Sequence, residues 1–237
     1  RLHHNAQRLL APLLVVNQNK TDPEKLRAVF REELARAYPS APQAELEAMH
    51  PGATALFVAG CGGDQNPLPR FYPGLVESYG KILAVAVHQV LSGPMQSVRG
   101  PLRTAFARTV IPFQTLPTRK ELLAILPGRN DVRRREVENL LSILGRTKKL
   151  PTSCEFPVQV WQFGSDLNLI ALAGEPVADY ALRFKREYGH DHTWVSGYND
   201  VLLAYIPSLR VLREGGYEGF TGMMEYGLPG AFAPGIE

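Results

Sequence analysis

Residues 60–70 of this chain read GCGGDQNPLPR, a glycine-rich turn with polar side chains at positions 64–66. The apolar run at 54–59 before the turn predicts a buried strand, and apolar side chains spaced three or four apart over 75–90 predict a helix after it. Because glycine has no Cβ, a ligand can approach the backbone of such a turn closely. The spacing matches neither the dinucleotide-binding glycine motif nor the P-loop, which argues against a nucleotide site. Strand, turn and helix in this order favour an α/β fold.

A second segment repeats this arrangement around Glu175. Residues 167–173 are apolar and predict a strand, and the apolar side chains of 177–184 lie on one helical face. Pro176 suits the first turn of that helix, where its missing N–H is no loss. Glu175 would then lie near the helix N-terminus, where the helix dipole favours negative charge. Simple capping would explain this acidic residue, but caps more often use Asp, Asn, Ser or Thr, so a functional role for Glu175 is the other interpretation.

The C-terminal part of the chain contains a third predicted strand and several tyrosines. Residues 193–200 predict the strand, and 201–208 are apolar but interrupted by a tyrosine and a proline. Tyr198 and Tyr205 can be ordinary core residues with hydrogen-bonded hydroxyls. Residues 213–219 predict a glycine-rich loop.

The middle of the chain adds strands and helices. Residues 98–113 and 156–163 predict strands, and a tight hairpin turn at 164–166 leads from the second of these into the strand that follows it.

Amphipathic helices are predicted at 118–126 and 131–144, and another begins at 21–24. No linker, repeat or low-complexity segment divides the sequence. We therefore expect a single domain over residues 1–237, of the α/β class, with a mixed β-sheet core, flanking helices and a helical insert at 117–150.

Composition and net charge exclude few classes of function. With 45% hydrophobic and 21% charged residues the chain can bury a full core. The net charge is +3, and the basic residues concentrate at 129–135 and 146–149. Because Glu136 and Glu138 interrupt them, a solvated helix face is favoured over nucleic-acid binding, and attraction to an anionic membrane surface is a third interpretation.

The two cysteines, Cys61 and Cys154, are weak signals. Cys61 lies in the glycine-rich turn, but no Cys-His-Asn pattern accompanies it, which favours a small packed residue over a nucleophile. Whether the two cysteines pair depends on distance and compartment, which the sequence does not supply.

Five short motifs occur in a fixed order along the chain. They are GGDQNP at 62–67, GEP at 174–176, SGYN at 196–199, AYIP at 204–207 and GYE at 216–218. Each is weak alone, but the ordered set resembles the neutral/alkaline (non-lysosomal) ceramidase family, specifically its bacterial ceramidase-like branch. The resemblance extends from about Pro51 to the C-terminus.

The resemblance implies a ceramidase-like catalytic domain that hydrolyses the amide of ceramide-like N-acyl lipids with metal-activated water. In that family one Zn²⁺ is held by two histidines, a glutamate and a tyrosine. The glutamate matches Glu175 and the tyrosine matches Tyr205. The expected partner is a small amphipathic lipid, met at a membrane surface by peripheral contact.

The family segment near the scissile amide matches Gly63, Asp64 and Asn66. Asn66 replaces the family serine, so a role that needs a hydroxyl is lost, although Asn66 can still hydrogen-bond a carbonyl or an oxyanion. The backbone N–H groups of residues 62–64 are a further hypothesis for holding the substrate carbonyl.

The family's two histidine ligands lie upstream of the glycine-rich turn. His3 or His4 lies at roughly the right distance for the second ligand, but the flanking residues do not match and the first ligand has no candidate. The chain begins at Arg1 with no initiator methionine or signal-like segment, so we expect a fragment of a longer enzyme, or else a degenerate relative. His190 and His192 are predicted to lie in an exposed turn.

Two other functions stay open. A non-catalytic lipid- or glycan-binding relative is favoured by Asn66, whereas the presence of both Glu175 and Tyr205 favours an enzyme. A zinc hydrolase of another amide is the second alternative. The resemblance alone favours a secreted or periplasmic protein.

Overall fold

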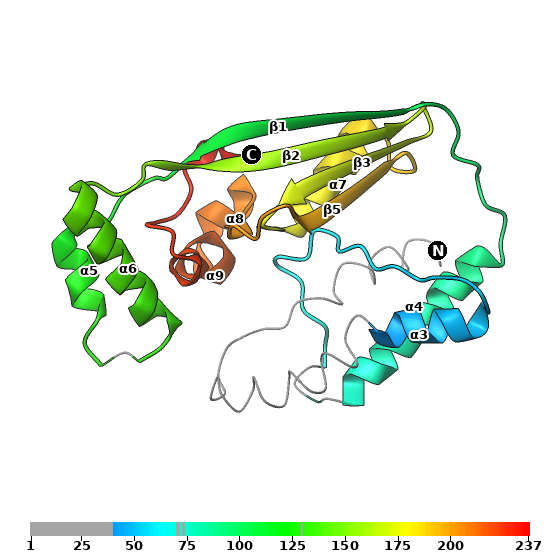
Figure 1. Ribbon diagram of the computed structural model, residues 1–237, viewed down its shortest axis with the longest axis horizontal. Coiled ribbons are helices and arrows are strands. Elements are labelled where there is room, and N and C mark those ends of the chain that lie inside the picture. Colours follow the sequence, from blue (N-terminus) through cyan, green and yellow to red (C-terminus); the bar gives the residue numbers. More distant parts are fainter. Residues whose placement is uncertain (1–39, 70–71, 73, 129) are drawn as a thin grey trace.

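A computed structural model describes residues 40–69, 72, 74–128 and 130–237. The core is a four-stranded mixed sheet in the order β1-β2-β3-β5 (Figure 1). Neighbouring strands are antiparallel from β1 to β3, whereas β3 and β5 are parallel. The sheet confirms the predicted α/β class with a mixed sheet. Its strands are β1 (Leu102–Pro112), β2 (Ser153–Phe163), β3 (Leu167–Ala173) and β5 (Thr193–Asn199).

The hairpin between β2 and β3 turns at residues 164–166, as predicted. Gly164 has a φ of +56°, and a Cβ there would collide with the Arg99 carbonyl oxygen. Asp166 closes the turn through its N–H, which donates to the Phe163 carbonyl oxygen at 3.1 Å, and its carboxylate accepts from the Arg99 N–H at 2.9 Å. The turn therefore needs glycine for both its backbone conformation and its close packing.

Helix α7 (Ala178–Tyr188) connects β3 to β5 and covers one face of the sheet. The helix has a strong apolar face, and its Tyr180 and Phe184 pack into the same core as Ile170 of β3 and Val195 of β5. Burial of this face, rather than intrinsic helix propensity, supplies most of the stability of such an amphipathic helix.

The opposite face of the sheet carries exposed aromatic side chains beside polar ones such as Gln159. Trp161 pairs with Leu169, and Leu169 pairs with Trp194, so these side chains share one face across three strands. Phe106 of β1 lies on the same face, and Phe106 and both tryptophans are exposed.

The helical insert lies between β1 and β2, beyond one end of the sheet (Figure 1). It consists of α5 (Arg119–Ile125) and α6 (Val132–Thr147). Thr118 caps α5 through a capping box with Glu121, and Asp131 caps α6, so the two helices predicted at 118–126 and 131–144 are confirmed. The insert has its own small core, formed by Leu122, Val137, Leu140 and Leu150. The single-domain assignment stays a prediction.

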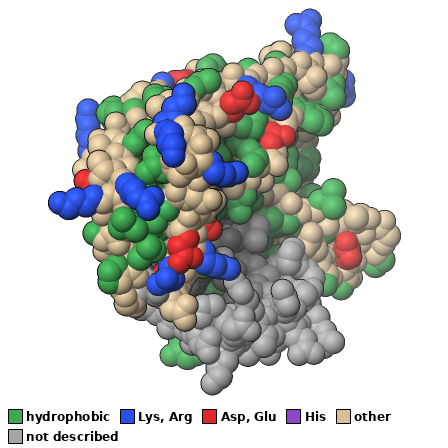
Figure 2. Space-filling view, turned by 60° about the vertical axis from the view of Figure 1, so that its left-hand side comes forward, with side chains coloured by type: hydrophobic (Ala, Val, Ile, Leu, Met, Phe, Trp, Pro, Cys, Tyr) green, Lys and Arg blue, Asp and Glu red, His purple; other side chains and the backbone are tan. Residues whose placement is uncertain are grey.

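Figure 2 shows the face of the molecule on the side of this insert, where basic side chains are spread among acidic, hydrophobic and other side chains. Two of the basic residues of α6 form ion pairs with glutamates: Arg134 with Glu138 at 2.9 Å and Arg133 with Glu225 at 3.8 Å.

Two further helices, α3 (Ser40–Met49) and α4 (Gly74–Leu91), pack against each other on the opposite side of the molecule (Figure 1). Helix α4 confirms the helix predicted after the glycine-rich turn. None of the described helices combines the length and the hydropathy that a membrane-spanning segment requires. The helix predicted to begin at 21–24 and the candidate ligands His3 and His4 lie outside the described residues.

The strand prediction for 54–59 is wrong. This segment contains no strand, and Leu56 and Val58 are exposed. Its hydrogen bonds to the sheet are made by its last residue, where the Ala59 carbonyl oxygen accepts from the Gly197 N–H at 3.1 Å and from the Ser196 hydroxyl at 3.0 Å. An apolar run becomes a strand only where a partner strand continues alongside it, and here the hydrogen bonding to β5 involves Ala59 alone among the residues of this segment.

Two C-terminal predictions are also corrected. Pro176 does not begin the helix, because it lies in the short strand β4 (Glu175–Pro176), which pairs in parallel with β6 (Tyr205–Ile206). Residues 213–219 are helical apart from Gly215, which separates two helices, so the predicted loop is limited to this one residue. The C-terminal region contains α8 (Leu209–Glu214), α9 (Gly216–Gly219) and the 3₁₀ helices η2 (Thr221–Tyr226) and η3 (Pro234–Ile236).

Candidate functional site

Glu175 and Tyr205, far apart in sequence, lie opposite each other in the β4–β6 pair. The Glu175 N–H donates to the Ala204 carbonyl oxygen at 2.7 Å, which fixes the register of the two short strands. Gly174, with a φ of +63°, allows the chain to leave β3 and enter β4 without a side chain colliding with Ala204. The two residues expected to bind zinc are therefore brought together by the fold, while their roles as ligands stay a prediction.

The glycine-rich turn packs directly against β4. The Gly63 N–H donates to the Pro176 carbonyl oxygen at 3.0 Å, and a Cβ on Gly63 would collide with the Glu175 carbonyl oxygen. This contact requires glycine on steric grounds. The Gly63 N–H is already hydrogen-bonded to Pro176. The hypothesis that the turn holds a substrate carbonyl therefore keeps only the N–H groups of Gly62 and Asp64 as candidate donors.

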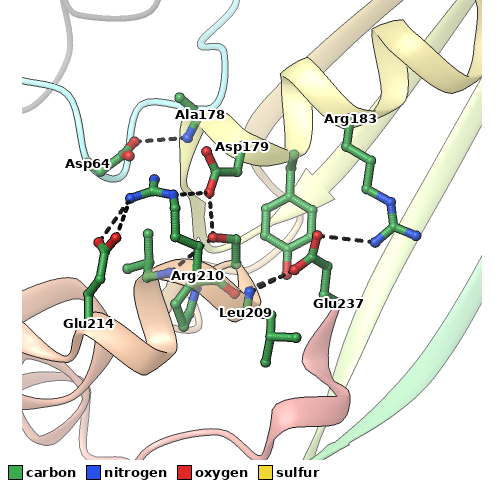
Figure 3. Close-up of polar contacts among 12 residues, drawn as sticks. Asp64, Ala178, Asp179, Arg183, Leu209, Arg210, Glu214 and Glu237 are labelled. Carbon is green, nitrogen blue, oxygen red and sulfur yellow. Dashed lines mark hydrogen bonds and ion pairs between the residues drawn. The ribbon is translucent and has the colours of Figure 1, made fainter.

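Asp64 connects this turn to helix α7 (Figure 3). Its Oδ1 accepts from the Ala178 N–H at 2.8 Å and from the Gln65 side chain at 3.1 Å. The N-cap residue Val177 has no side-chain hydrogen bond of its own, so Asp64 supplies the cap from a distant part of the sequence. Asp179, which follows Ala178 in α7, accepts hydrogen bonds from Ser208 at 2.6 Å and from Arg210 of α8 at 3.0 Å.

Replacing Asp64 by alanine is expected to cost about 1 kcal/mol of unfolding free energy, the usual effect of losing a helix cap. Asp64→Asn keeps an oxygen acceptor for the Ala178 N–H and should lose less. Urea denaturation followed by far-UV circular dichroism measures both. Equal stability of the alanine variant and the wild type would show that this contact does not stabilise α7.

The Glu175 carboxylate is buried among tyrosines. Glu175 is 7% exposed, and its two oxygens accept hydrogen bonds from Tyr198, at 3.2 Å, and from Tyr226. Tyr205 lies edge-on to both Tyr226 and Tyr217, with ring centroids 5.8 and 5.3 Å apart. In the described part of the chain no Lys, Arg or His forms an ion pair with Glu175.

Burial raises the pKa of Glu175, the two tyrosine hydroxyls oppose this, and the nearby Glu218 carboxylate adds to it. Burial and the Glu175 charge likewise raise the pKa values of Tyr198, Tyr205 and Tyr226. The phenols are therefore neutral at pH 7, and those of Tyr198 and Tyr226 donate hydrogen bonds to Glu175. A buried carboxylate without a cationic partner is costly, and the site is accordingly one that would gain from a bound cation.

Asn66 lies in the same turn, half-buried, and its Oδ1 is buried with no hydrogen-bond partner among the described residues. An unsatisfied buried acceptor is unusual and suits a donor supplied by a ligand, such as an amide N–H. The catalytic role expected for Asn66 stays a prediction.

The cysteines and the C-terminal histidines take no part in this cluster. Cys61 is buried beneath the turn and burial raises its pKa to about 12, so its thiol is not ionised at neutral pH. Cys154 also has a free thiol. His190 and His192 lie in an exposed turn, as predicted, and His192 contacts the Asp166 carbonyl oxygen at 2.9 Å.

The described residues fit part of a zinc site. A carboxylate and a phenol offer oxygen ligands, but a catalytic zinc is ordinarily held by three protein ligands that include histidine or cysteine. Among the described residues no three His, Cys, Asp or Glu side chains lie close enough together to hold a metal ion. Glu175 and Tyr205 therefore supply at most two positions of such a site.

Sequence reasoning did not identify Tyr226, which donates to Glu175 from η2. Tyr226 lies 51 positions from Glu175, in a segment without a motif, so no local signal marks it.

Comparison with known proteins gives a fold and no family. No protein-family model matches the chain, and no curated protein matches it either. The crystal structure of the neutral ceramidase from Pseudomonas aeruginosa is similar, with a TM-score of 0.52 and 18% identity over 84% of this chain. A ceramidase complexed with C2 gives a TM-score of 0.54 and 14% identity, also over 84%. The chain spans only 38% and 39% of those two proteins. The fold of this chain is therefore ceramidase-like.

Proposed function

We propose that this chain belongs to a zinc-dependent amide hydrolase that acts on ceramide-like N-acyl lipids. The observation that carries the proposal is the buried Glu175 carboxylate, which lies in register with Tyr205 and has no cationic partner among the described residues. Similarity to the fold of neutral ceramidases supports it. The rest of the zinc ligand set would come from outside the described residues.

When bound, zinc would supply Lewis-acid chemistry at an amide carbonyl and make water more acidic. The residues of this chain would have supporting tasks. Tyr198 and Tyr226 hold the Glu175 carboxylate in one orientation through their hydroxyl groups. Asn66 presents an unpaired Oδ1 that can accept from the amide N–H of a substrate. Tyr205, as a neutral phenol, can donate a hydrogen bond to an oxygen atom. Next to a bound cation it can instead lose its proton, because the positive charge stabilises the phenolate.

Contact with a lipid surface is part of the same proposal, because the substrate is amphipathic. The exposed sheet face with Phe106, Trp161 and Trp194 supports it, since aromatic side chains are favoured at membrane–water interfaces.

The experiment that tests this proposal measures the zinc content of the purified chain and its rate of hydrolysis of a fluorescent short-chain ceramide. We expect the wild type to bind one zinc ion more per chain than Glu175→Gln, with a smaller loss in Tyr205→Phe and with hydrolysis falling in parallel. Tyr188→Phe is the control, because Tyr188 is exposed on α7 away from the cluster. Equal zinc content in Glu175→Gln and the wild type would overturn the assignment of Glu175.

A non-catalytic lipid- or glycan-binding protein is the second candidate, favoured by Asn66 in place of the family serine. A wild-type chain that takes up no more zinc than Glu175→Gln, and that binds ceramide without hydrolysing it, would support this candidate. Zinc binding with hydrolysis of a different N-acyl amide would instead change the substrate alone.

A further inference from the structure

His50 and His88 face each other at the ends of two helices, although 38 residues separate them in the sequence. His50 directly follows α3, and its N–H still donates to the Leu46 carbonyl oxygen at 2.9 Å. His88 lies in the last turn of α4, where Ser92 donates to its carbonyl oxygen from both N–H and hydroxyl, at 3.0 and 2.8 Å. The backbone at both positions is therefore fixed by hydrogen bonds.

The two helices run in the same direction along each other. Glu45 of α3 approaches Lys81 of α4 at 4.0 Å, and one to two turns later His50 approaches His88. Their C-terminal ends, which carry the negative ends of the helix dipoles, therefore lie together. This end of the helix pair favours positive charge.

The imidazole nitrogens are spaced as two ligands of one metal ion. His50 Nε2 and His88 Nδ1 are 3.1 Å apart, with the ring centroids 5.1 Å apart and the ring planes at 45°. Two nitrogens bound at 2.0–2.1 Å to a tetrahedral zinc would lie about 3.3 Å apart. A small adjustment of either side chain would therefore admit the ion.

We propose that His50 and His88 bind a divalent transition metal ion, Zn²⁺ or Co²⁺, which joins the C-terminal end of α3 to that of α4. Imidazole is a preferred ligand for both ions. Both side chains are half-buried, so the remaining coordination positions are accessible to water. The site is separate from the Glu175 cluster and does not depend on the proposed function.

The test is amide hydrogen exchange with and without Zn²⁺, read in residues 40–50 and 74–91. At a free zinc concentration ten times the dissociation constant, local opening of the two helices should fall about elevenfold if the open form does not bind. In His50→Gln and His88→Gln a hydrogen bond between the two side chains is retained while the second imidazole is lost. Zinc binding should then weaken at least about tenfold, because even the loss of a group that only hydrogen-bonds to a metal ligand weakens metal binding by that much.

Two controls separate this site from other zinc-binding groups. His192→Gln, in the exposed turn, and Glu175→Gln, in the tyrosine cluster, should leave the zinc-induced protection of α3 and α4 unchanged. The proposal is overturned if zinc does not slow exchange in these helices of the wild type, in which case the histidines are simply hydrogen-bonded. It is equally overturned if both glutamine variants respond to zinc as the wild type does.

Discussion

Replacing Phe232 by alanine is expected to lower the unfolding free energy by about 3–5 kcal/mol, the usual cost of removing a fully buried phenylalanine. Phe232 has 0% exposure and stacks on Phe113, with the ring centroids 5.5 Å apart. The same two residues form a β-bridge, and the Ala233 N–H donates to the Pro112 carbonyl oxygen at 2.8 Å. The substitution therefore leaves a cavity where the C-terminal segment attaches to the end of β1.

Urea denaturation measures this loss, and Phe220 offers a matched control. Phe220 is 58% exposed, so Phe220→Ala should change stability by less than about 0.5 kcal/mol, as is usual at the surface. Phe232→Leu retains most of the buried volume and should lose much less than the alanine variant. If Phe232→Ala and Phe220→Ala were equally stable, the C-terminal segment would not be part of the core.

Gly63→Ala should push the glycine-rich turn away from β4 and lower the unfolding free energy by about 1–3 kcal/mol, the usual effect of overpacking. The new Cβ would collide with the Glu175 carbonyl oxygen and lie 3.1 Å from the Pro176 carbonyl oxygen. These are backbone atoms, which cannot rotate away as a side chain can. The turn must therefore move. This movement weakens the hydrogen bond from the Gly63 N–H to Pro176 and displaces Asp64 and Asn66.

Gly145→Ala is the control, and its expected effect has the opposite sign. Gly145 lies inside α6, and a Cβ there would meet no atom within 4 Å apart from its chain neighbours and the nearby backbone of the helix itself. Alanine there should stabilise the protein by about 0.5–1 kcal/mol, because it reduces the freedom of the unfolded chain and favours helix. Thermal denaturation of both variants measures the contrast. A Gly63→Ala protein as stable as the wild type would contradict the close packing of the turn on β4.

The sequence predicted those elements whose signals are local. Asp131 and the apolar periodicity after it predict α6, and the turn at 164–166 predicts the β2–β3 hairpin, since capping and tight turns involve neighbouring residues. The apolar run at 54–59 has the composition of a strand but lacks a continuous partner, and a partner strand is not encoded locally. The prediction that Pro176 begins the helix is wrong for the same reason, because β4 exists only through its pairing with β6.

For the candidate site, the sequence by itself determined the residue types: a glycine where the turn meets β4, a glutamate after β3 and a tyrosine before Ile206. Ordered motifs suffice for this, because each turn fixes its own short segment. Only the tertiary structure placed Glu175 opposite Tyr205, added Tyr226 from η2 and brought His50 to His88. These contacts join residues 30 to 51 positions apart in sequence. Packing of the whole chain, through buried apolar surface and backbone hydrogen bonds, decides which of these distant residues meet.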